Sequence, residues 1–245
     1  MDIGIPESII TCPESIAEIV STTNATPQIG RLTEFDERSV DIVLVEGNIA
    51  YGEAIEADLD IPLLPMATTP CLEPIQVANL TQAITDLLQN NGEYVDRLGL
   101  MLSNGELDAT AYFSVLIGTS EAAAISEFSV RTASHSLGQY RADGIIVSAP
   151  SGTNGYPHAA GSSRIGPNVT ALSVIPLSAY QTTSEHWTVD SSGVTVEVLR
   201  EETPVSVFAD TRMVGSLSPN EPLTIRGEQI ATTVRVPDSI SPFPP

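Results

Sequence analysis

Two patterns of apolar residues divide the chain near residue 100. Before that point, short β-branched runs alternate with stretches of helical spacing, and Ile3 to Ile5 is expected to form a short first strand. The run from Val40 to Val45 is almost entirely apolar, which is typical of a strand covered on both faces. Ile61 to Leu64 repeats the pattern, and Val77 to Leu88 has the period of an amphipathic helix. Residues 1–100 are therefore predicted to form an α/β domain with parallel strands and helical crossovers.

After residue 100 the helical period fades, and short runs rich in Val, Ile, Thr and Ser are separated by Gly and Pro. The expected strands are Tyr94 to Ser103, Thr110 to Ile117, Ala124 to Arg131, Gly144 to Ser148, Ala171 to Ile175, Val194 to Leu199, Val205 to Ala209 and Leu223 to Arg226. Such a density of short strands predicts a β-rich, sandwich-like domain over residues 101–230. The Pro-rich end, residues 231–245, is expected to be an extended tail.

The charge balance excludes several classes of partner. The chain of 245 residues has 31 acidic and 10 basic residues, and it contains no lysine. The acidic residues are dispersed and 42% of all residues are hydrophobic, so we expect a folded protein with an anionic surface and no disordered acidic tail. This composition resembles proteins of salt-accumulating halophilic archaea. It argues against nucleic acid or an anionic membrane as a partner, because phosphate binding needs clustered Lys or Arg.

Targeting and metal signals are absent from the sequence. No run of 18 apolar residues occurs, and the segment MDIGIPES has neither a basic nor an apolar signal region, so we expect a cytoplasmic protein without a membrane span. Cys12 and Cys71 are expected to be separate, buried or half-buried thiols. The three histidines show no ligand spacing, and no metal site is expected.

The segment from Gly144 to Gly161 is the strongest candidate for a binding site. A predicted strand runs into Ala-Pro-Ser-Gly-Thr-Asn-Gly-Tyr, which combines two glycines, three polar side chains and an aromatic ring. The small residues Ala159 to Gly161 follow and are suited to begin a helix. A loop of this kind can bind anions and ribose hydroxyls, but on composition alone an ordinary surface turn is the commoner outcome.

The order of residues in this segment resembles the signature of the NAD kinase family. Asp143-Gly144, an apolar strand and the loop Ser148 to Tyr156 match the family's Asp-Gly, strand and TPTGSTAY-type loop. Thr153, Asn154 and Gly155 stand where the family has Ser, Thr and Ala. Later matches are Ile175-Pro176 and Phe208-Ala209-Asp210. The resemblance implies a two-domain fold, with an α/β domain before a β-rich one, as expected from the patterns above.

The resemblance implies roles for particular residues. The family's Asn-Glu pair corresponds to Ser126-Glu127, so the Glu is kept and the Asn is not. The positions implied to line a pocket for NAD or NADP are Ser126, Glu127, Asp143, Thr153, Asn154, Gly155, Tyr156 and Asp210. The resemblance further implies that Mg²⁺ accompanies ATP or polyphosphate if the chain is active, and that the chain forms a homo-oligomer.

The first domain departs from the family at its catalytic motif. The family carries GGDG after a strand, and its Asp acts as general base toward the ribose 2′-hydroxyl of NAD. Here the strand is followed by a predicted polar loop, Glu46-Gly47-Asn48, in which only Gly47 matches. Asn48 stands at the position of the Asp, and an amide cannot accept a proton as a carboxylate does. Loss of a general base typically costs about 10²- to 10⁴-fold in rate.

These observations leave several hypotheses. The chain is an active NAD kinase that uses ATP or polyphosphate, or an impaired relative that binds the dinucleotide and regulates an intact NAD kinase in a hetero-oligomer. A third reading is an unrelated protein whose loop imitates the signature. The substitution at Asn48 favours impaired phosphoryl transfer, whereas Glu127, Asp143 and Tyr156 favour retained nucleotide binding.

Overall fold

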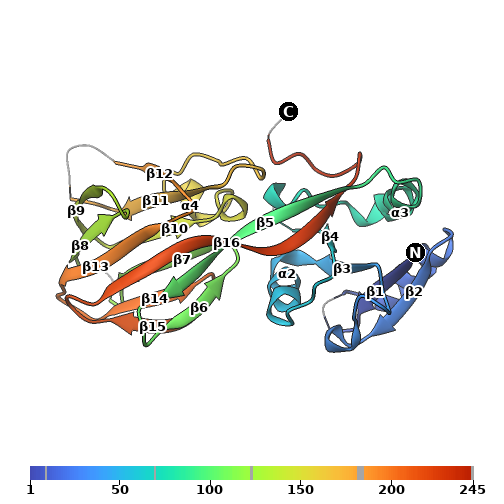
Figure 1. Ribbon diagram of the computed structural model, residues 1–245, viewed down its shortest axis with the longest axis horizontal. Coiled ribbons are helices and arrows are strands. Elements are labelled where there is room, and N and C mark those ends of the chain that lie inside the picture. Colours follow the sequence, from blue (N-terminus) through green and yellow to red (C-terminus); the bar gives the residue numbers. More distant parts are fainter. Residues whose placement is uncertain (9, 69, 122–123, 181–184, 244–245) are drawn as a thin grey trace. The chain divides into compact units, whose positions relative to one another are not determined.

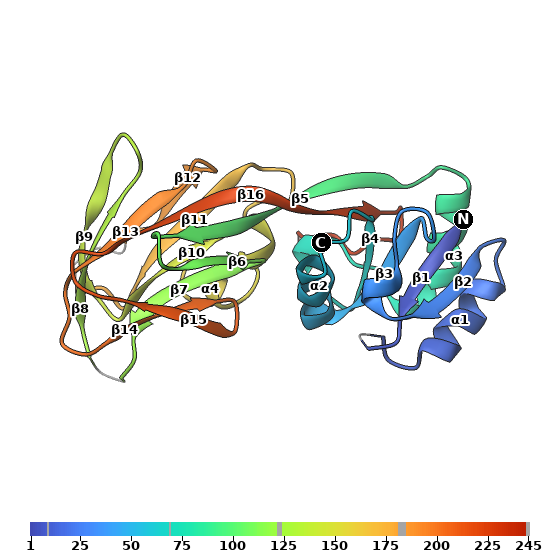
Figure 2. The same cartoon turned by 60° about the horizontal axis from the view of Figure 1, so that its bottom comes forward.

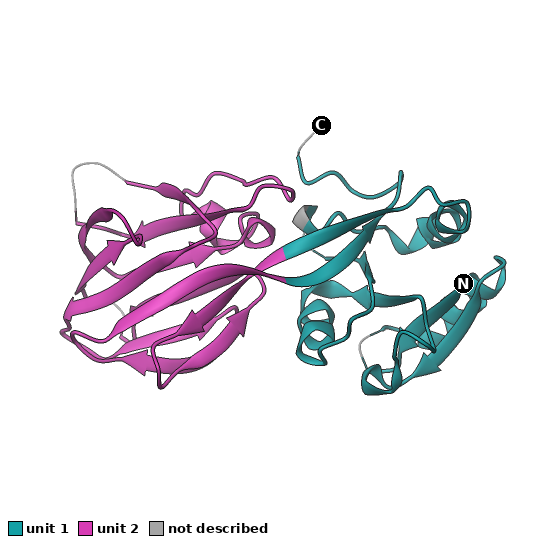
Figure 3. Cartoon of the chain, in the orientation of Figure 1, with its two compact units in different colours: residues 1–97, 230–245 teal, residues 98–229 magenta. Residues whose placement is uncertain are grey.

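The chain folds into two compact units (Figure 3). The computed structural model describes residues 1–8, 10–68, 70–121, 124–180 and 185–243. Unit 1 comprises residues 1–97 and 230–245, and unit 2 comprises residues 98–229. The first boundary lies close to the predicted one. Residues 231–245, expected to be a separate tail, belong to unit 1, because their strand continues to Arg235 and Val234 and Val236 are buried in its core.

Unit 1 is built on a parallel sheet (Figure 1). Its strands lie in the order β2-β1-β3-β4-β16. Their bounds are β1 (Asp2–Pro6), β2 (Thr26–Gly30), β3 (Ile42–Glu46), β4 (Leu63–Met66) and β16 (Pro222–Arg235). β1 pairs in parallel with both β2 and β3, and β3 pairs in parallel with β4. Strand order reverses between β1 and β3, so the loops after their carboxyl ends meet at the edge where α/β sheets commonly bind ligands.

Helices cover both faces of this sheet. The helices are α1 (Pro13–Ser21), α2 (Gly47–Glu56) and α3 (Leu80–Leu88), and the 3-10 turns are η1 (Leu32–Glu34), η2 (Pro70–Leu72) and η3 (Val77–Asn79). α1 contacts β1, β2 and α3 (Figure 2). Ile16 and Val20 of α1 share a core with Ile3 and Leu44 of the sheet. α2 packs on β3 and β4. The predicted α/β fold of this half is confirmed.

Two expectations for unit 1 were wrong in detail. The segment after β3 is the first turn of α2, not a polar loop. The helix was hard to recognise in the sequence because Gly47 and Gly52 have low helix propensity. In addition, two of its buried residues, Ala50 and Tyr51, are adjacent in sequence and so do not follow helical spacing. Cys12 is a free, exposed thiol instead of a buried one. The side chain of Cys71 lies outside the described part of the structure.

Unit 2 is a sandwich of two sheets. One contains β16, β13 (Val194–Arg200), β8 (Ser126–Arg131) and β9 (Ser136–Ala142) in that order, with β5 (Glu93–Ser103) paired to β16 and β6 (Asp108–Ala111) paired to β5. The other has the order β12-β11-β10-β7-β14-β15. These strands are β7 (Ser114–Thr119), β10 (Gly144–Ser148), β11 (Ala171–Leu177), β12 (Trp187–Asp190), β14 (Val205–Ala209) and β15 (Arg212–Leu217). The predicted β-rich fold is therefore confirmed.

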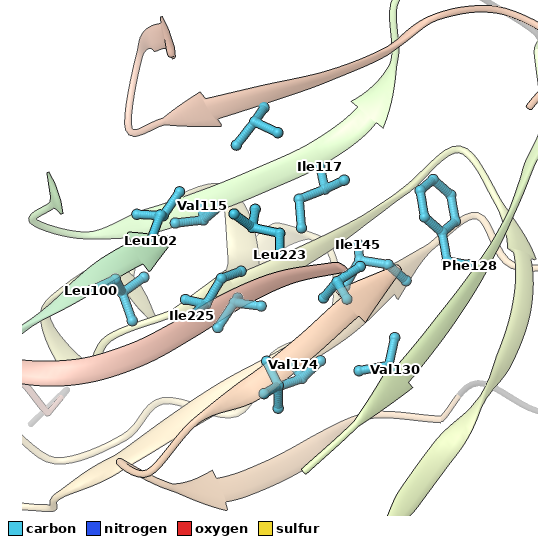
Figure 4. Packing of buried hydrophobic residues seen from close by; sticks show 14 of the residues in the cluster. Leu100, Leu102, Val115, Ile117, Phe128, Val130, Ile145, Val174, Leu223 and Ile225 are labelled. Atoms are coloured by element: carbon cyan, nitrogen blue, oxygen red, sulfur yellow. The ribbon is translucent and has the colours of Figure 1, made fainter. Parts of the chain in front are cut away.

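The core of unit 2 lies between its sheets (Figure 4). Val115 and Ile117 of β7 and Ile145 of β10 face Phe128 and Val130 of β8, and all are buried. Burying each such side chain contributes about 1.5–3 kcal/mol. Alternating positions of these strands point into the core, which is why the short β-branched runs of the sequence predicted strands in these segments.

The predicted strand from Thr110 to Ile117 is interrupted in the structure. It forms β6 and β7, and Tyr112 and Phe113 lie between them. β5 and β16 each run from one unit into the other and so supply both connections at the unit boundary. Within the described part of the chain, no helix has the length and hydropathy required to cross a membrane.

Candidate functional site

The loop that follows β10 is a braced structure with an exposed tip. After Ser148 the chain makes a 3-10 turn, η4 (Pro150–Gly152), and then the short helix α4 (Tyr156–Ala159). Proline occupies the first turn of both elements, where its missing N–H costs nothing. Residues 149–153 are buried, whereas Gly155 and Tyr156 are exposed, Tyr156 by 61%. α4 ends where the sequence predicted a helix to begin, at Ala159.

Thr153 acts as an internal brace of this loop. Its side chain is fully buried, donates its hydroxyl proton to the Pro150 carbonyl at 2.8 Å and accepts the Ile165 N–H at 3.0 Å. A hydroxyl has only one proton to donate. Thr153 therefore holds the loop to the segment after α4, and its hydroxyl has no proton left for a ligand.

The three residues after Thr153 form the accessible part of the loop. Asn154 is half-buried, and Gly155 occupies the N-cap position of α4 with φ −97°. A Cβ added at Gly155 would meet no atom closer than 3.7 Å, so the site has room for the Ala that the resembling signature carries. Tyr156 presents its ring to solvent. The predicted contacts of Gly155 and Tyr156 with a ligand are thus sterically open, whereas the carboxamide oxygen of Asn154 is buried.

A second segment, Tyr112–Ser114, forms hydrogen bonds with the buried part of the loop. The Phe113 carbonyl accepts the Ala149 N–H at 3.0 Å, and the Tyr112 carbonyl accepts the Ser151 hydroxyl at 2.9 Å. A Cβ on Gly152 would lie 2.0 Å from the Phe113 oxygen, so only glycine allows this approach. The sequence did not identify this segment as part of the site, because its residue pattern does not differ from that of the strand predicted there.

Asp210 lies beside the same segment. It follows β14 in the left-handed conformation, with φ +54°. Its carboxylate accepts the N–H groups of Tyr112, Phe113 and Ser114 at 2.8, 2.8 and 2.9 Å. The structure therefore brings Asp210 to the same end of the sheet as the loop, but its carboxylate is bonded to backbone.

The other predicted residues of unit 2 lie at the opposite end of β10. Asp143 precedes β10, whereas the loop follows it, and about 3.3 Å per strand residue puts roughly 20 Å between Asp143 and Ala149. Ser126 pairs with Ala142 in the neighbouring strands, so Ser126 and Glu127 lie near the Asp143 end. Gly144 is required there, since a Cβ would lie 2.5 Å from the Ile117 oxygen.

Each residue of this second group has a distinct environment. Ser126 is buried, and its hydroxyl has no hydrogen-bond partner within the described part of the chain. Glu127 forms an ion pair with Arg141 at 3.4 Å across β8 and β9, with both side chains partly exposed. The Asp143 side chain is exposed, and its backbone joins neighbouring strands through Leu177 and Thr119. The eight predicted binding residues therefore lie in two groups at opposite ends of β10.

In unit 1 the junction of β3 and α2 carries the remaining predicted residue. Gly47 starts α2 with φ +83°, a conformation that favours glycine. Asn48 lies exposed in the first turn of the helix. The Glu46 carboxylate accepts the Thr11 N–H at 2.6 Å and so ties the loop after β1 to the end of β3. Glu46 is therefore engaged in holding two neighbouring loops at the carboxyl edge of the sheet.

Comparisons with known proteins point to the same family that the sequence of this loop resembles. The profile of the ATP-NAD kinase C-terminal domain matches residues 114–236, half of the chain. The NAD kinase of Methanosarcina mazei is 25% identical over 177 residues, which are 71% of this chain and 61% of that protein. The NAD kinase of Methanothermobacter thermautotrophicus is 27% identical over 197 residues, covering 75% and 69%. The match thus spans less than two thirds of the Methanosarcina mazei relative.

Solved structures show the same fold. An NAD kinase from Archaeoglobus fulgidus in complex with ATP superposes with a TM-score of 0.73 at 16% identity, covering 97% of this chain and 94% of that chain. Yeast NADH kinase complexed with NADH gives a TM-score of 0.71 at 13% identity, covering 92% and 73%. With the profile match over half of its length, the chain belongs to the NAD kinase family.

Proposed function

We propose that this chain binds a nicotinamide adenine dinucleotide, NAD(H) or NADP(H), at the loop after β10, and that its phosphoryl transfer is impaired. The observation that carries the binding proposal is the loop itself: its interior is fixed by Thr153 and by Tyr112–Ser114, and its tip is open. A loop that is already fixed in the free protein lowers the ordering cost of binding. The ligands named for the related structures, ATP and NADH, support this class.

The exposed tip has groups suited to a dinucleotide. The Tyr156 ring combines an apolar face, on which a base can stack, with a hydroxyl that hydrogen-bonds. The half-buried Asn154 carries amide N–H donors, while its acceptor oxygen is buried. The contacts of Ser126, Glu127 and Asp143 with the ligand stay predictions, because these residues lie at the other end of β10.

Impaired phosphoryl transfer rests on Asn48. The family resemblance places the general base at this position, and the carboxamide of Asn48 cannot take up the proton of the ribose 2′-hydroxyl. Glu46 is the neighbouring carboxylate, but it accepts the Thr11 N–H at 2.6 Å. Positioning and electrostatics supply most phosphoryl-transfer catalysis, so a slow residual rate with ATP or polyphosphate and Mg²⁺ is compatible with this site.

A regulatory role is the second candidate function. A chain that binds the dinucleotide but lacks the base can act as a nucleotide-sensing subunit, either in a homo-oligomer or in a hetero-oligomer with an intact NAD kinase. Asn48 favours it, since the substitution removes the proton acceptor while the loop in unit 2 keeps its bracing. In this proposal the protein is cytoplasmic, and its partners are dinucleotides, neither nucleic acid nor membrane.

Binding is tested by calorimetry with NAD and NADP in molar KCl. We expect dissociation constants between micromolar and millimolar, and a weakening of about fivefold to a hundredfold in Tyr156→Ala, since stacking contributes about 1–3 kcal/mol per base. Tyr94→Ala is the matched control, because Tyr94 is also 61% exposed but lies on β5 in unit 1. Failure of the unmodified chain to bind either nucleotide would refute the binding proposal. Equal losses in the two variants would refute the role of Tyr156.

Catalysis is tested by NADP formation with ATP and then with polyphosphate. We expect little or no product from the unmodified chain and an increase of about 10²-fold or more in Asn48→Asp, because the substitution restores a proton acceptor. Asn48→Ser is the control that changes size and polarity without adding a base. Turnover typical of kinases, about 1–100 s⁻¹, in the unmodified chain would overturn the proposed impairment.

A further inference from the structure

We infer that Asp210 is a positioning residue for the dinucleotide loop and acts through the backbone of Tyr112–Ser114. This inference rests on the proposed binding function and assigns Asp210 a different task from the direct ligand contact that the sequence suggested. Two layers of contacts carry it: one joins Asp210 to the segment, and the other joins the segment to the loop.

The first layer occupies nearly the whole carboxylate. One oxygen, Oδ1, accepts the N–H groups of Phe113 and Ser114, and Oδ2 accepts that of Tyr112. A carboxylate has about four lone-pair positions, so three of them are used within the protein. The Asp210 N–H also donates to the Ser114 carbonyl at 2.8 Å. Hydrogen bonds to an ionised acceptor are about twice as strong as neutral ones, which makes this contact a firm anchor.

The hairpin that carries Asp210 holds the segment at a second point. Arg212, the first residue of β15, donates to the Thr110 carbonyl at 3.1 Å, and its guanidinium lies 5.5 Å from the centre of the Tyr112 ring. The turn between β14 and β15 therefore contacts both the backbone and an aromatic side chain of the supporting segment. The break in the strand predicted from Thr110 to Ile117 falls at the residues whose N–H groups Asp210 accepts.

The second layer transmits this anchoring to the loop. The Phe113 carbonyl fixes the first residue of the loop through the Ala149 N–H, and the Tyr112 carbonyl fixes Ser151. Gly152 lies so close to Phe113 that any shift of the segment displaces the turn Pro150–Gly152. Since Tyr156 follows this turn by only four residues, the placement of the ligand-facing tip depends on the segment that Asp210 holds.

The test compares Asp210→Asn with Asp190→Asn. In the Asp210→Asn variant an amide NH₂ must face at least one backbone N–H donor, so the negative charge and at least one of the three hydrogen bonds are lost with little change in volume. Asp190 is the matched control: it is the last residue of β12, before the turn to β13 in unit 2, and its carboxylate also accepts a backbone N–H, that of Ser192 at 2.8 Å. Both variants are measured in molar KCl as the full chain.

Amide hydrogen exchange and NAD affinity are the readouts. In Asp210→Asn we expect exchange at Ala149 and Gly152 to accelerate and the dissociation constant for NAD to rise about tenfold, in line with the loss of hydrogen bonds to a charged acceptor. Asp190→Asn should change neither. Combining Asp210→Asn with Ser151→Ala should weaken NAD binding by less than the product of the two single effects, because both act on one chain of contacts.

The outcomes separate this inference from the proposed function. Weaker NAD binding with unchanged exchange at Ala149 would overturn it in favour of direct ligand contact by Asp210. A lower melting temperature with both readouts unchanged would also overturn it. Faster exchange at Ala149 in a chain that binds no NAD would refute the proposed function and leave the anchoring intact. If Asp210→Asn does not fold, Arg212→Met releases Thr110 while keeping the turn, and the same changes are expected at smaller size.

Discussion

Glu73 and Arg97 form a buried ion pair in unit 1, where both side chains are 2–5% exposed. The Glu73 carboxylate contacts Arg97 at 3.1 Å and Arg235 at 2.9 Å, and Arg97 donates to the Thr233 hydroxyl at 2.6 Å. The hydrogen bond that Arg235 donates to Glu73, together with a second one that it donates to Glu93, raises the pKa of Arg235 above its ordinary value. Glu73 and Arg97 therefore connect β5, β16 and the segment after β4.

Neutralising Glu73 should destabilise the protein strongly. Glu73→Gln leaves the buried guanidinium of Arg97 without its counter-charge, and breaking a buried pair in this way costs about 3–5 kcal/mol. The control is Glu34→Gln in the same unit, because the Arg31–Glu34 pair is exposed and such pairs contribute about 0–1 kcal/mol. Urea unfolding in molar KCl gives both free energies of unfolding. Equal small losses would show that Arg97 does not depend on Glu73 for its charge balance.

At the scale of the elements, the sequence predicted interior strands and missed edge strands. Gly144 to Ser148 and Val205 to Ala209 were predicted with their observed bounds, since both lie between two neighbours and are almost wholly apolar. The strands without a counterpart among the predictions are β2, β9, β12 and β15, and each lies at the edge of a sheet. Edge strands have one neighbour and are kept short, polar or irregular, so they lack the alternation that reveals interior strands.

The candidate site was predictable in part for a related reason. The loop from Ala149 to Tyr156 is contiguous and carries its own turn residues, so its existence could be predicted from local sequence, although only its tip at Gly155 and Tyr156 is exposed. The roles of Thr153 and Asp210 could not. Their hydrogen-bond partners, Ile165 and Tyr112–Ser114, are distant in sequence, and only the fold shows that their polar groups are already bonded within the protein. The opposite ends of β10 likewise separate Asp143 from the loop.

At the scale of the whole molecule, a formal net charge of −21 is the dominant property of the surface. The acidic residues are dispersed, so their repulsion acts over many pairs of moderate separation. Screening lengths fall from about 10 Å at 0.1 M salt to about 3 Å at 1 M. Because repulsion between like charges opposes the compact state, salt should stabilise this chain by removing a destabilising term, without any bound ion.

We therefore expect the melting temperature to rise steeply with KCl, by about 2–4 °C for each 1 kcal/mol of repulsion that is screened. The triple variant Glu14→Gln, Glu18→Gln and Glu53→Gln removes charges from exposed positions of α1 and α2. It should melt higher than the unmodified chain at 0.1 M KCl and at the same temperature at 2 M, since screening makes the removed charges irrelevant. Differential scanning calorimetry across both salt concentrations measures this convergence. A constant offset between the two proteins at all concentrations would show that the substitutions act on helix propensity and that salt stabilises the fold by another route.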